Sequence, residues 1–321
     1  MAQVPQSTQS FGEKLQSLPK WNLYLVLIIL TSAPLFAKIS VPNKPREASI
    51  DFYGKLMSIP EGSRILIGSD WTNSTRGESK GSMKALLRIL MRRKIKFAVY
   101  STADTQSPQV ARDTIREVNM ERIARKEAPY KGFEDWVSLG YFPNTEGTDN
   151  SINNNILGAF AGKKDSPENS GPKDVFDSPV FKGVKGVQDF QLVALITASS
   201  TNTATLERIK KVPLLFMVTG VMVPENQNYY ASGQIVGLVG GVKGVYDMEQ
   251  LMEYGINNPG PNLIPSTKWG LVPGFPGDLN AGMGTAYYPT LHFALSLLIL
   301  AILTGNIGMF LARKKTKNGE A

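Results

Sequence analysis

An uncharged stretch from Pro289 to Ala312 constrains this chain more than any other feature of its sequence. Its 24 residues contain no Asp, Glu, Lys or Arg. The chain then turns basic at Arg313, Lys314, Lys315 and Lys317. A helix needs about 20 apolar residues to cross the hydrocarbon core of a bilayer, so we predict a transmembrane helix over residues 288–312. Lys and Arg beside a span resist translocation, so the tail over 313–321 is expected in the cytoplasm.

A second apolar segment runs from Trp21 to Ile39 and contains one charge, Lys38. It has two interpretations: an uncleaved membrane anchor, which we favour, or a cleaved signal peptide. Leu35 stands where a signal peptidase site prefers a small residue, which supports the anchor. Residues 1–20 are polar and are predicted to form a disordered cytoplasmic tail. The prediction is a two-pass cell-membrane protein, or a single-pass one after cleavage, with the bulk of the chain extracytoplasmic.

The composition excludes several kinds of chemistry. The chain of 321 residues has no cysteine, so disulfides, thiolate nucleophiles and zinc sites with Cys ligands are ruled out. Its only histidine, His292, lies inside the predicted membrane helix, so the region before that helix cannot form a Ser-His-Asp triad or bind a metal through histidine. The net charge is +8 and is concentrated at the two ends, and no basic stripe with interleaved aromatic residues suggests nucleic-acid binding.

Between the two membrane segments, short apolar runs alternate with amphipathic stretches. Buried strands are predicted at 64–68, 96–100, 136–141, 190–197 and 213–219. Helices are predicted at 50–59, 78–93, 107–127, 149–161 (capped by Asp149) and 203–211. Alternating strands and helices favour parallel pairing, and continuous apolar runs favour strands covered on both faces. The fold class is therefore α/β: a Rossmann-like, mostly parallel sheet with flanking helices, between two transmembrane helices.

The remaining segments divide this region. A linker is expected over 40–60, the α/β domain over 61–255, and a Pro- and Gly-rich extended tether over 256–287. The stretch 162–187 is rich in Gly, Pro, Lys and Asp and is expected to be a surface loop, with a lid as the alternative. Gly233, Gly237 and Gly241 are four residues apart, which predicts one helix face for close packing, either within the domain or against an oligomer partner.

Polar residues follow the predicted strands, where ligands bind in open parallel sheets. The candidate ligand-binding residues are Asp70, Thr72, Ser74, Thr102, Asp104, Ser199 and Asn202. The alternative is that these are ordinary polar loop residues, because loops lie on the surface.

One short motif in the first of these loops is similar to a known metal site. Asp70, Thr72 and Ser74, spaced Asp-x-Thr-x-Ser after a strand and before a helix, resemble the Asp-x-Ser-x-Ser metal motif of von Willebrand factor A domains. The resemblance implies Mg²⁺ binding, since a carboxylate and hydroxyls suit that ion. The later strand end Ile196-Thr197-Ala198-Ser199 lacks the Asp that such domains place there. The alternative is that the hydroxyls cap the next helix.

These features predict a membrane-anchored extracytoplasmic α/β module that acts as a non-catalytic subunit, scaffold or ligand sensor of an envelope complex. The expected partners are the lipid bilayer and a membrane protein or a second copy of the chain, and no nucleic acid. The alternative is a membrane-tethered hydrolase that uses the strand-end Asp, Ser and Thr residues with a divalent metal.

Overall fold

The computed structural model describes residues 11–16, 19–37, 39, 41–167, 170–277 and 282–319. The chain forms two compact units: Pro42–Gly284, and the two ends, Met1–Val41 with Thr285–Ala321. The compact unit Pro42–Gly284 therefore includes most of the segment predicted as a linker and most of the segment predicted as a tether.

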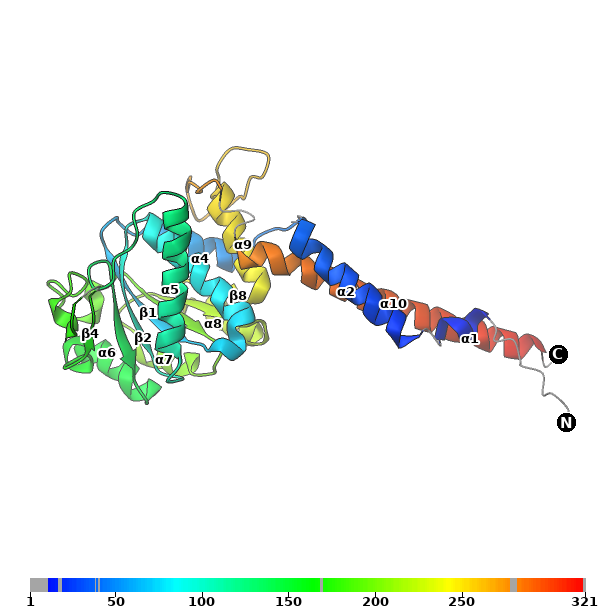
Figure 1. Cartoon of the computed structure of the whole chain (residues 1–321), viewed down its shortest axis with the longest axis horizontal. Coiled ribbons are helices and arrows are strands. Elements are labelled where there is room, and N and C mark those ends of the chain that lie inside the picture. The colour runs from blue at the N-terminus through cyan, green and yellow to red at the C-terminus, as the bar shows by residue number, and fades with distance from the viewer. Residues whose placement is uncertain are drawn as a thin grey trace. The chain divides into compact units, whose positions relative to one another are not determined.

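The larger unit is built on one six-stranded sheet (Figure 1). Its strands are β1 (Arg64–Asp70), β2 (Lys96–Ser101), β3 (Trp136–Tyr141), β6 (Val193–Thr197), β7 (Leu214–Val218) and β8 (Gly237–Gly240). They lie in the order β3-β2-β1-β6-β7-β8, and every pair is parallel. This is the Rossmann-like order, in which the chain moves outward from the sheet centre first in one direction and then in the other. The predicted α/β class is confirmed.

Helices cover both faces of this sheet because its strands are apolar on both sides. Ile65 and Ile67 of β1 face one core layer, whereas Leu66 faces the other, and all three are fully buried. The first layer is covered by α4 (Arg76–Arg92), α5 (Ser107–Ala124) and α9 (Gly241–Tyr254); α5 lies in front of the strands in Figure 1. The second is covered by α6 (Thr145–Ala159) and α7 (Asn202–Arg208), with α8 (Val223–Ala231) packed at its margin.

The helix α3 (Glu47–Met57) packs on β8 and α9. It covers an edge strand that would otherwise offer unpaired backbone groups. Gly237 of β8 makes this contact possible, because a Cβ there would lie 2.5 Å from the Cα of Phe52 in α3. The segment predicted as a linker thus contributes a helix to the core.

The prediction of a shared glycine helix face is wrong. Gly233 lies in the loop after α8, Gly237 lies in β8, and Gly241 is the first residue of α9. The short apolar run at 235–240 forms a strand of the parallel sheet. The four-residue spacing of the glycines therefore does not place them on one helix face. Gly241 has a φ of +59°, and its position is close to the backbone of Gly220.

The helix predicted at 149–161 begins earlier than expected. It starts at Thr145, and the side chain of Asn144 caps it by accepting a hydrogen bond from Gly147 N at 3.0 Å. Asp149 is therefore an interior helical residue and is fully buried. The prediction that Asp149 caps this helix is wrong.

The stretch 162–187 contains a small hairpin and several turns. Its strands β4 (Lys164–Asp165) and β5 (Lys173–Asp174) pair antiparallel. A 3₁₀ turn follows at Val175–Asp177, and a second, Val187–Asp189, begins at the end of the stretch. Elsewhere in the unit, 3₁₀ turns occur at Asn73–Thr75 and Gly220–Met222. Val175, Val180 and Phe181 are buried in the second core layer. Because these side chains belong to the core of the domain, the stretch 162–187 is part of that domain and does not separate two domains.

The predicted tether folds back on the domain over residues 256–275. Ile256 pairs with Val272 in an antiparallel bridge, and Ile264 is 7% exposed. The side-chain amide of Asn257 donates to the carbonyls of Ser266 at 2.8 Å and Trp269 at 2.5 Å. Prolines and glycines therefore shape a packed loop here, in place of an extended chain.

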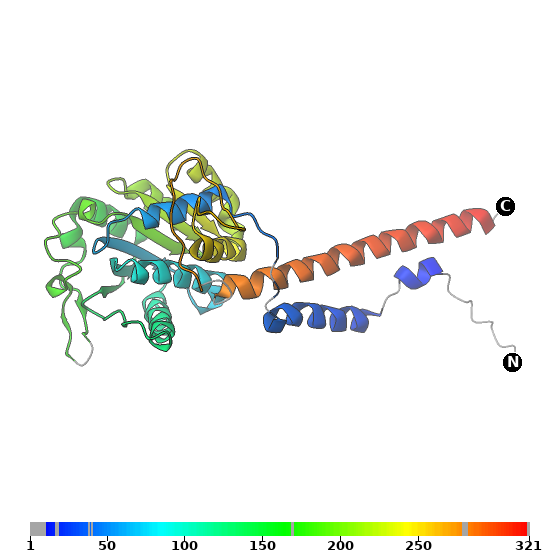
Figure 2. The same cartoon turned by 90° about the horizontal axis from the view of Figure 1, so that it is seen from above.

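The smaller unit consists of helices. They are α1 (Phe11–Gln16), α2 (Lys20–Ala37) and α10 (Met283–Gly319), and the last two lie antiparallel in Figure 2. Thr290 of α10 donates to the carbonyl of Thr31 in α2 at 3.4 Å. Both α2 and α10 are long and apolar enough to span a membrane, over 18 and 31 residues. The short helix α1 lies where a disordered tail is predicted, and residues 1–10 of that tail lie outside the described part of the chain.

Candidate functional site

The carboxyl ends of all six strands lie at one edge of the sheet, because every strand is parallel. The chain reverses its direction of progress between β1 and β6, whose last residues Asp70 and Thr197 are paired neighbours. In open α/β sheets, ligands bind in the crevice outside this point. Asp70 ends β1, and the other six predicted ligand-binding residues follow β1, β2 or β6, so all seven lie at this edge.

Asp70 is almost completely buried and ties the loop after β2 to the end of β1. Its Oδ1 atom accepts hydrogen bonds from Thr102 N at 2.6 Å, Ala103 N at 3.1 Å and Ser101 Oγ at 3.1 Å. Its Oδ2 atom accepts one from Thr102 Oγ1 at 2.8 Å. Four donors occupy most of the acceptor capacity of one carboxylate. The structure thus brings Asp70 and Thr102 together, and their hydrogen bonds hold the loop after β2 against the end of β1.

Thr72 and Ser74 contact each other instead of Asp70. Their hydroxyl oxygens are 2.7 Å apart, and Thr75 Oγ1 donates to Thr72 O at 3.2 Å in the turn that leads into α4. Among the described residues, no hydrogen bond joins Asp70 to Thr72 or Ser74, and no three His, Asp or Glu side chains gather as a metal site. In this conformation the Asp70 carboxylate is hydrogen-bonded to the loop after β2, and the Thr72 and Ser74 hydroxyls are bonded to each other.

The Asp104 side chain and the backbone of Ser199 make hydrogen bonds within their own loops. The Asp104 carboxylate accepts from Gln106 N at 2.7 Å, just before α5. The backbone N–H of Ser199 donates to Thr197 Oγ1 at 2.9 Å, and that hydroxyl donates to Ser199 O at 3.0 Å. Side chains that bond their own loops in this way commonly fix turn geometry.

Asn202, the first residue of α7, is fully buried. Its amide nitrogen donates to Asn226 Oδ1 at 2.8 Å, and the Asn226 amide nitrogen donates to Met222 O at 2.8 Å. The Oδ1 atom of Asn202 and the hydroxyl of Thr201 are buried, and the described part of the chain offers neither a hydrogen-bond partner. Buried polar atoms are nearly always hydrogen-bonded, so these two oxygens are candidates for binding a ligand or a water molecule after β6.

A second buried carboxylate, Asp149, lies near this edge and was not predicted as a site residue. It accepts hydrogen bonds from Tyr100 Oη at 3.0 Å and Thr205 Oγ1 at 2.6 Å. Burial raises the pKa of Asp149 to about 6, the two hydrogen bonds oppose that rise, and the charge of Asp70 adds to it. Burial and the Asp149 carboxylate also hold the pKa of Tyr100 well above its usual range.

A signal for Asp149 was present in the sequence. Asp149, Ile152 and Ile156 fall at helical spacing on one face, and all three are fully buried. A correct start for this helix would have placed the carboxylate among the inward residues. Tyr100 and Thr205 carry no comparable signal, since only the packing of β2 against α6 and α7 brings them to Asp149.

The edge as a whole supplies hydroxyls, amides and two buried carboxylates that already have partners. These groups can hold a small polar ligand or fix loop geometry. No protein family, curated protein or solved structure was found to match this chain.

Proposed function

We propose that this chain is a membrane-anchored, extracytoplasmic α/β module that acts without catalysis, as a scaffold, subunit or ligand sensor of an envelope complex. The observation that carries the proposal is the exposed apolar surface of α2 and α10. Only 6% of the residues in the apolar window of each helix are buried. Large side chains that are more than half exposed include Ile28, Ile29, Phe36, Leu298, Ile299, Leu300, Ile302 and Phe310.

Such surfaces favour a lipid environment over water. Monomeric soluble proteins rarely expose a contiguous apolar patch of more than a few hundred Å², and the core of a bilayer removes this surface from water. At about 1.5 Å per residue, α2 spans roughly 27 Å and the apolar part of α10 is longer. We therefore propose that α2 and α10 together form the membrane anchor.

The proposed orientation rests on the basic tail after α10. Residues 313–317 contain Arg313, Lys314, Lys315 and Lys317 and no acidic residue. Under the positive-inside rule this end stays in the cytoplasm. With two antiparallel spans, the α/β unit between them is then extracytoplasmic and the N-terminus is cytoplasmic.

The natural absence of cysteine allows a direct test of this topology. We expect a Val221→Cys variant, whose native side chain is 89% exposed between β7 and α8, to react with a membrane-impermeant maleimide in intact cells. An Asn318→Cys variant should react only after the membrane is permeabilised. Labelling of Asn318→Cys but not Val221→Cys in intact cells would reverse the orientation and overturn the proposal.

The bracing role of Asp70 supports a function without catalysis at that residue. Asp70→Ala would leave two backbone N–H groups and two hydroxyls without their acceptor, so we expect a loss of about 3–5 kcal/mol of stability in thermal or urea unfolding. Asp70→Asn retains the Oδ1 acceptor and should fold and assemble normally. The exposed Asp113→Asn substitution serves as the control for loss of one negative charge.

The hydrolase alternative makes the opposite prediction for the same variants. If Asp70→Asn abolished a biological function while melting temperature and complex assembly were unchanged, a catalytic or metal-binding carboxylate would be required. Purification of the full-length chain in mild detergent provides the assembly readout. A stoichiometric membrane partner or a homo-oligomer is the expected result.

A further inference from the structure

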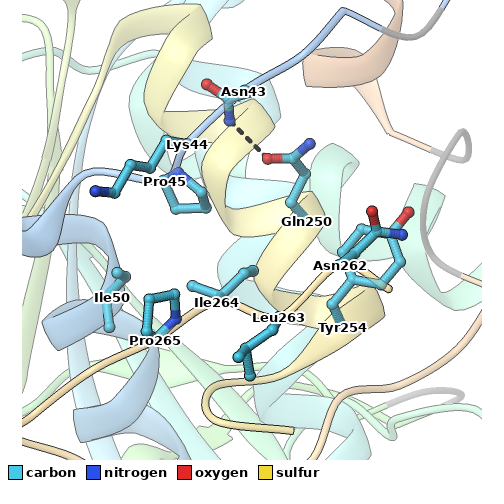
Figure 3. A pocket seen from close by; sticks show the side chains of 10 residues that line it. All are labelled: Asn43, Lys44, Pro45, Ile50, Gln250, Tyr254, Asn262, Leu263, Ile264 and Pro265. Atoms are coloured by element: carbon cyan, nitrogen blue, oxygen red, sulfur yellow. Dashed lines mark hydrogen bonds between the residues drawn. The ribbon is translucent and has the colours of Figure 1, made fainter. Parts of the chain in front are cut away.

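A cavity of about 340 Å³ lies in the α/β unit, away from the carboxyl edge of the sheet (Figure 3). Segment 43–45, the first turn of α3, the second half of α9 and the loop 262–265 form its walls. The ten lining residues are Asn43, Lys44, Pro45, Ile50, Gln250, Tyr254, Asn262, Leu263, Ile264 and Pro265. Its volume falls at the small end of the range for ligand pockets.

The cavity has an apolar floor and a polar, positively charged rim. Ile50 and Ile264 are each 7% exposed and belong to one core cluster, whereas Leu263 is 54% exposed. In Figure 3 the side chains of Ile50, Pro265, Ile264 and Leu263 gather on one side, and Asn43 and Gln250 lie on the opposite side. None of the ten lining residues is acidic, and Lys44 brings one positive charge.

The polar rim presents donors to the cavity. Gln250 uses Oε1 to accept from the Asn43 amide at 2.6 Å, so the amide nitrogen of Gln250 is oriented as a donor. Lys44 is exposed and its ammonium group lies above Ile50 in Figure 3. Donors and one cation without a carboxylate favour a ligand group that is an acceptor and carries negative charge.

The walls of the cavity are held in place by buried polar contacts. Asp247 is fully buried and accepts from Asn43 Nδ2 at 2.8 Å, Arg46 N at 3.1 Å and Lys243 Nζ at 2.5 Å, which fixes the segment 43–46 against α9. Asn257 organises the opposite loop, since its Oδ1 atom accepts from Ser266 N at 2.8 Å. A pocket with fixed walls loses little entropy when a ligand binds.

Two walls of the cavity belong to the two connectors of the chain. Segment 43–45 follows α2 in sequence, and the loop 262–265 belongs to the segment that leads to α10. A ligand in the cavity would contact both connectors at once. That position suits a sensor, because the ligand would contact the two segments that continue along the chain into the two apolar helices.

We propose that this cavity binds a small amphipathic carboxylate. Its apolar body would pack against Ile50, Ile264 and Leu263. Its carboxylate would lie at the polar rim beside the amide of Gln250, and the exposed Lys44 would supply the positive charge there. The inference deepens the sensor role and rests on the proposed function for its biological setting.

The test uses the full-length protein in detergent and fluorinated probes observed by ¹⁹F NMR. The probe is 4-fluorophenylacetate, compared with the neutral 4-fluorophenylacetamide and the cationic 4-fluorobenzylamine. We expect saturable binding of the anion and at least about tenfold weaker binding of the cation. Partition into detergent differs among the three probes, so each probe is also measured with empty micelles and that background is subtracted.

Three variants locate the binding site. Leu263→Trp fills the cavity from an exposed position and should abolish anion binding, and Lys44→Glu should weaken it by about tenfold or more. Lys182→Glu makes the same charge change at an exposed position outside the cavity and should leave binding within about twofold of the wild type. Circular dichroism melts confirm that each variant folds.

The outcomes separate this inference from the proposed function. Absence of saturable anion binding, or equal binding by wild type and Leu263→Trp, overturns the cavity as a carboxylate site whatever the cysteine labelling shows. Binding that depends on Leu263 and Lys44, together with a reversed labelling pattern, would retain the site and overturn the extracytoplasmic orientation.

Discussion

Asp70 and Asp149 are two buried carboxylates with different surroundings. Asp70 has four hydrogen-bond donors, two of them backbone N–H groups, whereas Asp149 has two hydroxyl donors. Hydrogen bonds to a carboxylate favour its charged form, and burial disfavours it. In Asp149 burial prevails, so its protonated form is stabilised in the folded protein.

We predict that Asp149→Asn removes a pH-dependent loss of stability. The pKa of Asp149 rises from 3.8 to about 6 in the folded state, so this group contributes most stability below pH 3.8 and loses it as pH rises through about 6. The difference corresponds to up to about 3 kcal/mol. The amide can still accept from Tyr100 and can donate to the Thr205 hydroxyl, so the variant should gain stability relative to wild type between pH 4 and 7.5.

Thermal melts of full-length protein in detergent across this pH range measure the effect. Asp113→Asn is a suitable control because Asp113 is on the exposed side of α5, where its carboxylate is 50% exposed. The melting temperature of Asp149→Asn minus that of wild type should increase steadily with pH. A flat or decreasing difference would contradict a raised pKa.

Among the elements, the segment 256–275 departs most from its predicted structure. It is latched to α3 by Asp51, whose carboxylate is 3% exposed and accepts from Trp269 Nε1 at 2.8 Å, Lys268 Nζ at 2.6 Å and Tyr230 Oη at 2.7 Å. The Trp269 ring occupies the space above Gly54, where any other residue would place its Cβ. A buried carboxylate and a glycine together dock the segment.

We predict that Gly54→Ala releases this segment without unfolding the sheet. The added methyl group would collide with the Trp269 ring, and overpacking of this kind costs about 1–3 kcal/mol. Amide hydrogen exchange over residues 257–275 should accelerate, while β1 and β6 remain protected. Gly77→Ala in α4 is the matched control, since its methyl group would enter open space and helix propensity favours alanine. Unchanged exchange in Gly54→Ala would argue against the latch.

At the scale of the whole molecule, the α/β unit has a complete core of its own. Both core layers consist of residues between Ala48 and Ile264. The two helices that are long and apolar enough to span a membrane, α2 and α10, lie almost entirely in the other unit. The proposed membrane attachment and the stability of the α/β unit should therefore be separable.

We predict that the fragment 42–284 folds without detergent. It should be monodisperse in gel filtration and unfold in one cooperative thermal transition, because a domain of this size buries enough apolar surface to be stable alone. The full-length chain should require detergent or lipid. Aggregation of the fragment, or a non-cooperative melt, would mean that the ends contribute to the core.

Local patterns in the sequence were sufficient for most of the elements. The apolar run at 136–141 is a strand with the predicted bounds, and the helix predicted from residue 107 begins at Ser107. The alternation of such runs with amphipathic stretches led to the parallel α/β class, because burial on both faces requires continuous apolar strands. The uncharged stretch after Pro289 likewise marks a helix that is apolar enough to span a membrane.

Tertiary structure alone decided what depends on residues far apart in the chain. Gly237 became part of an edge strand because β8 pairs with β7, and its missing side chain lets Phe52 pack against it. The amide of Asn257 bonds to Ser266 and Trp269, so a Pro- and Gly-rich stretch became a docked loop. The same holds for the side chain of Asp70, which turns toward Thr102. Spacing along the chain records local periodicity, whereas the partner of a buried polar group or a glycine is set by which strands and helices the fold brings together.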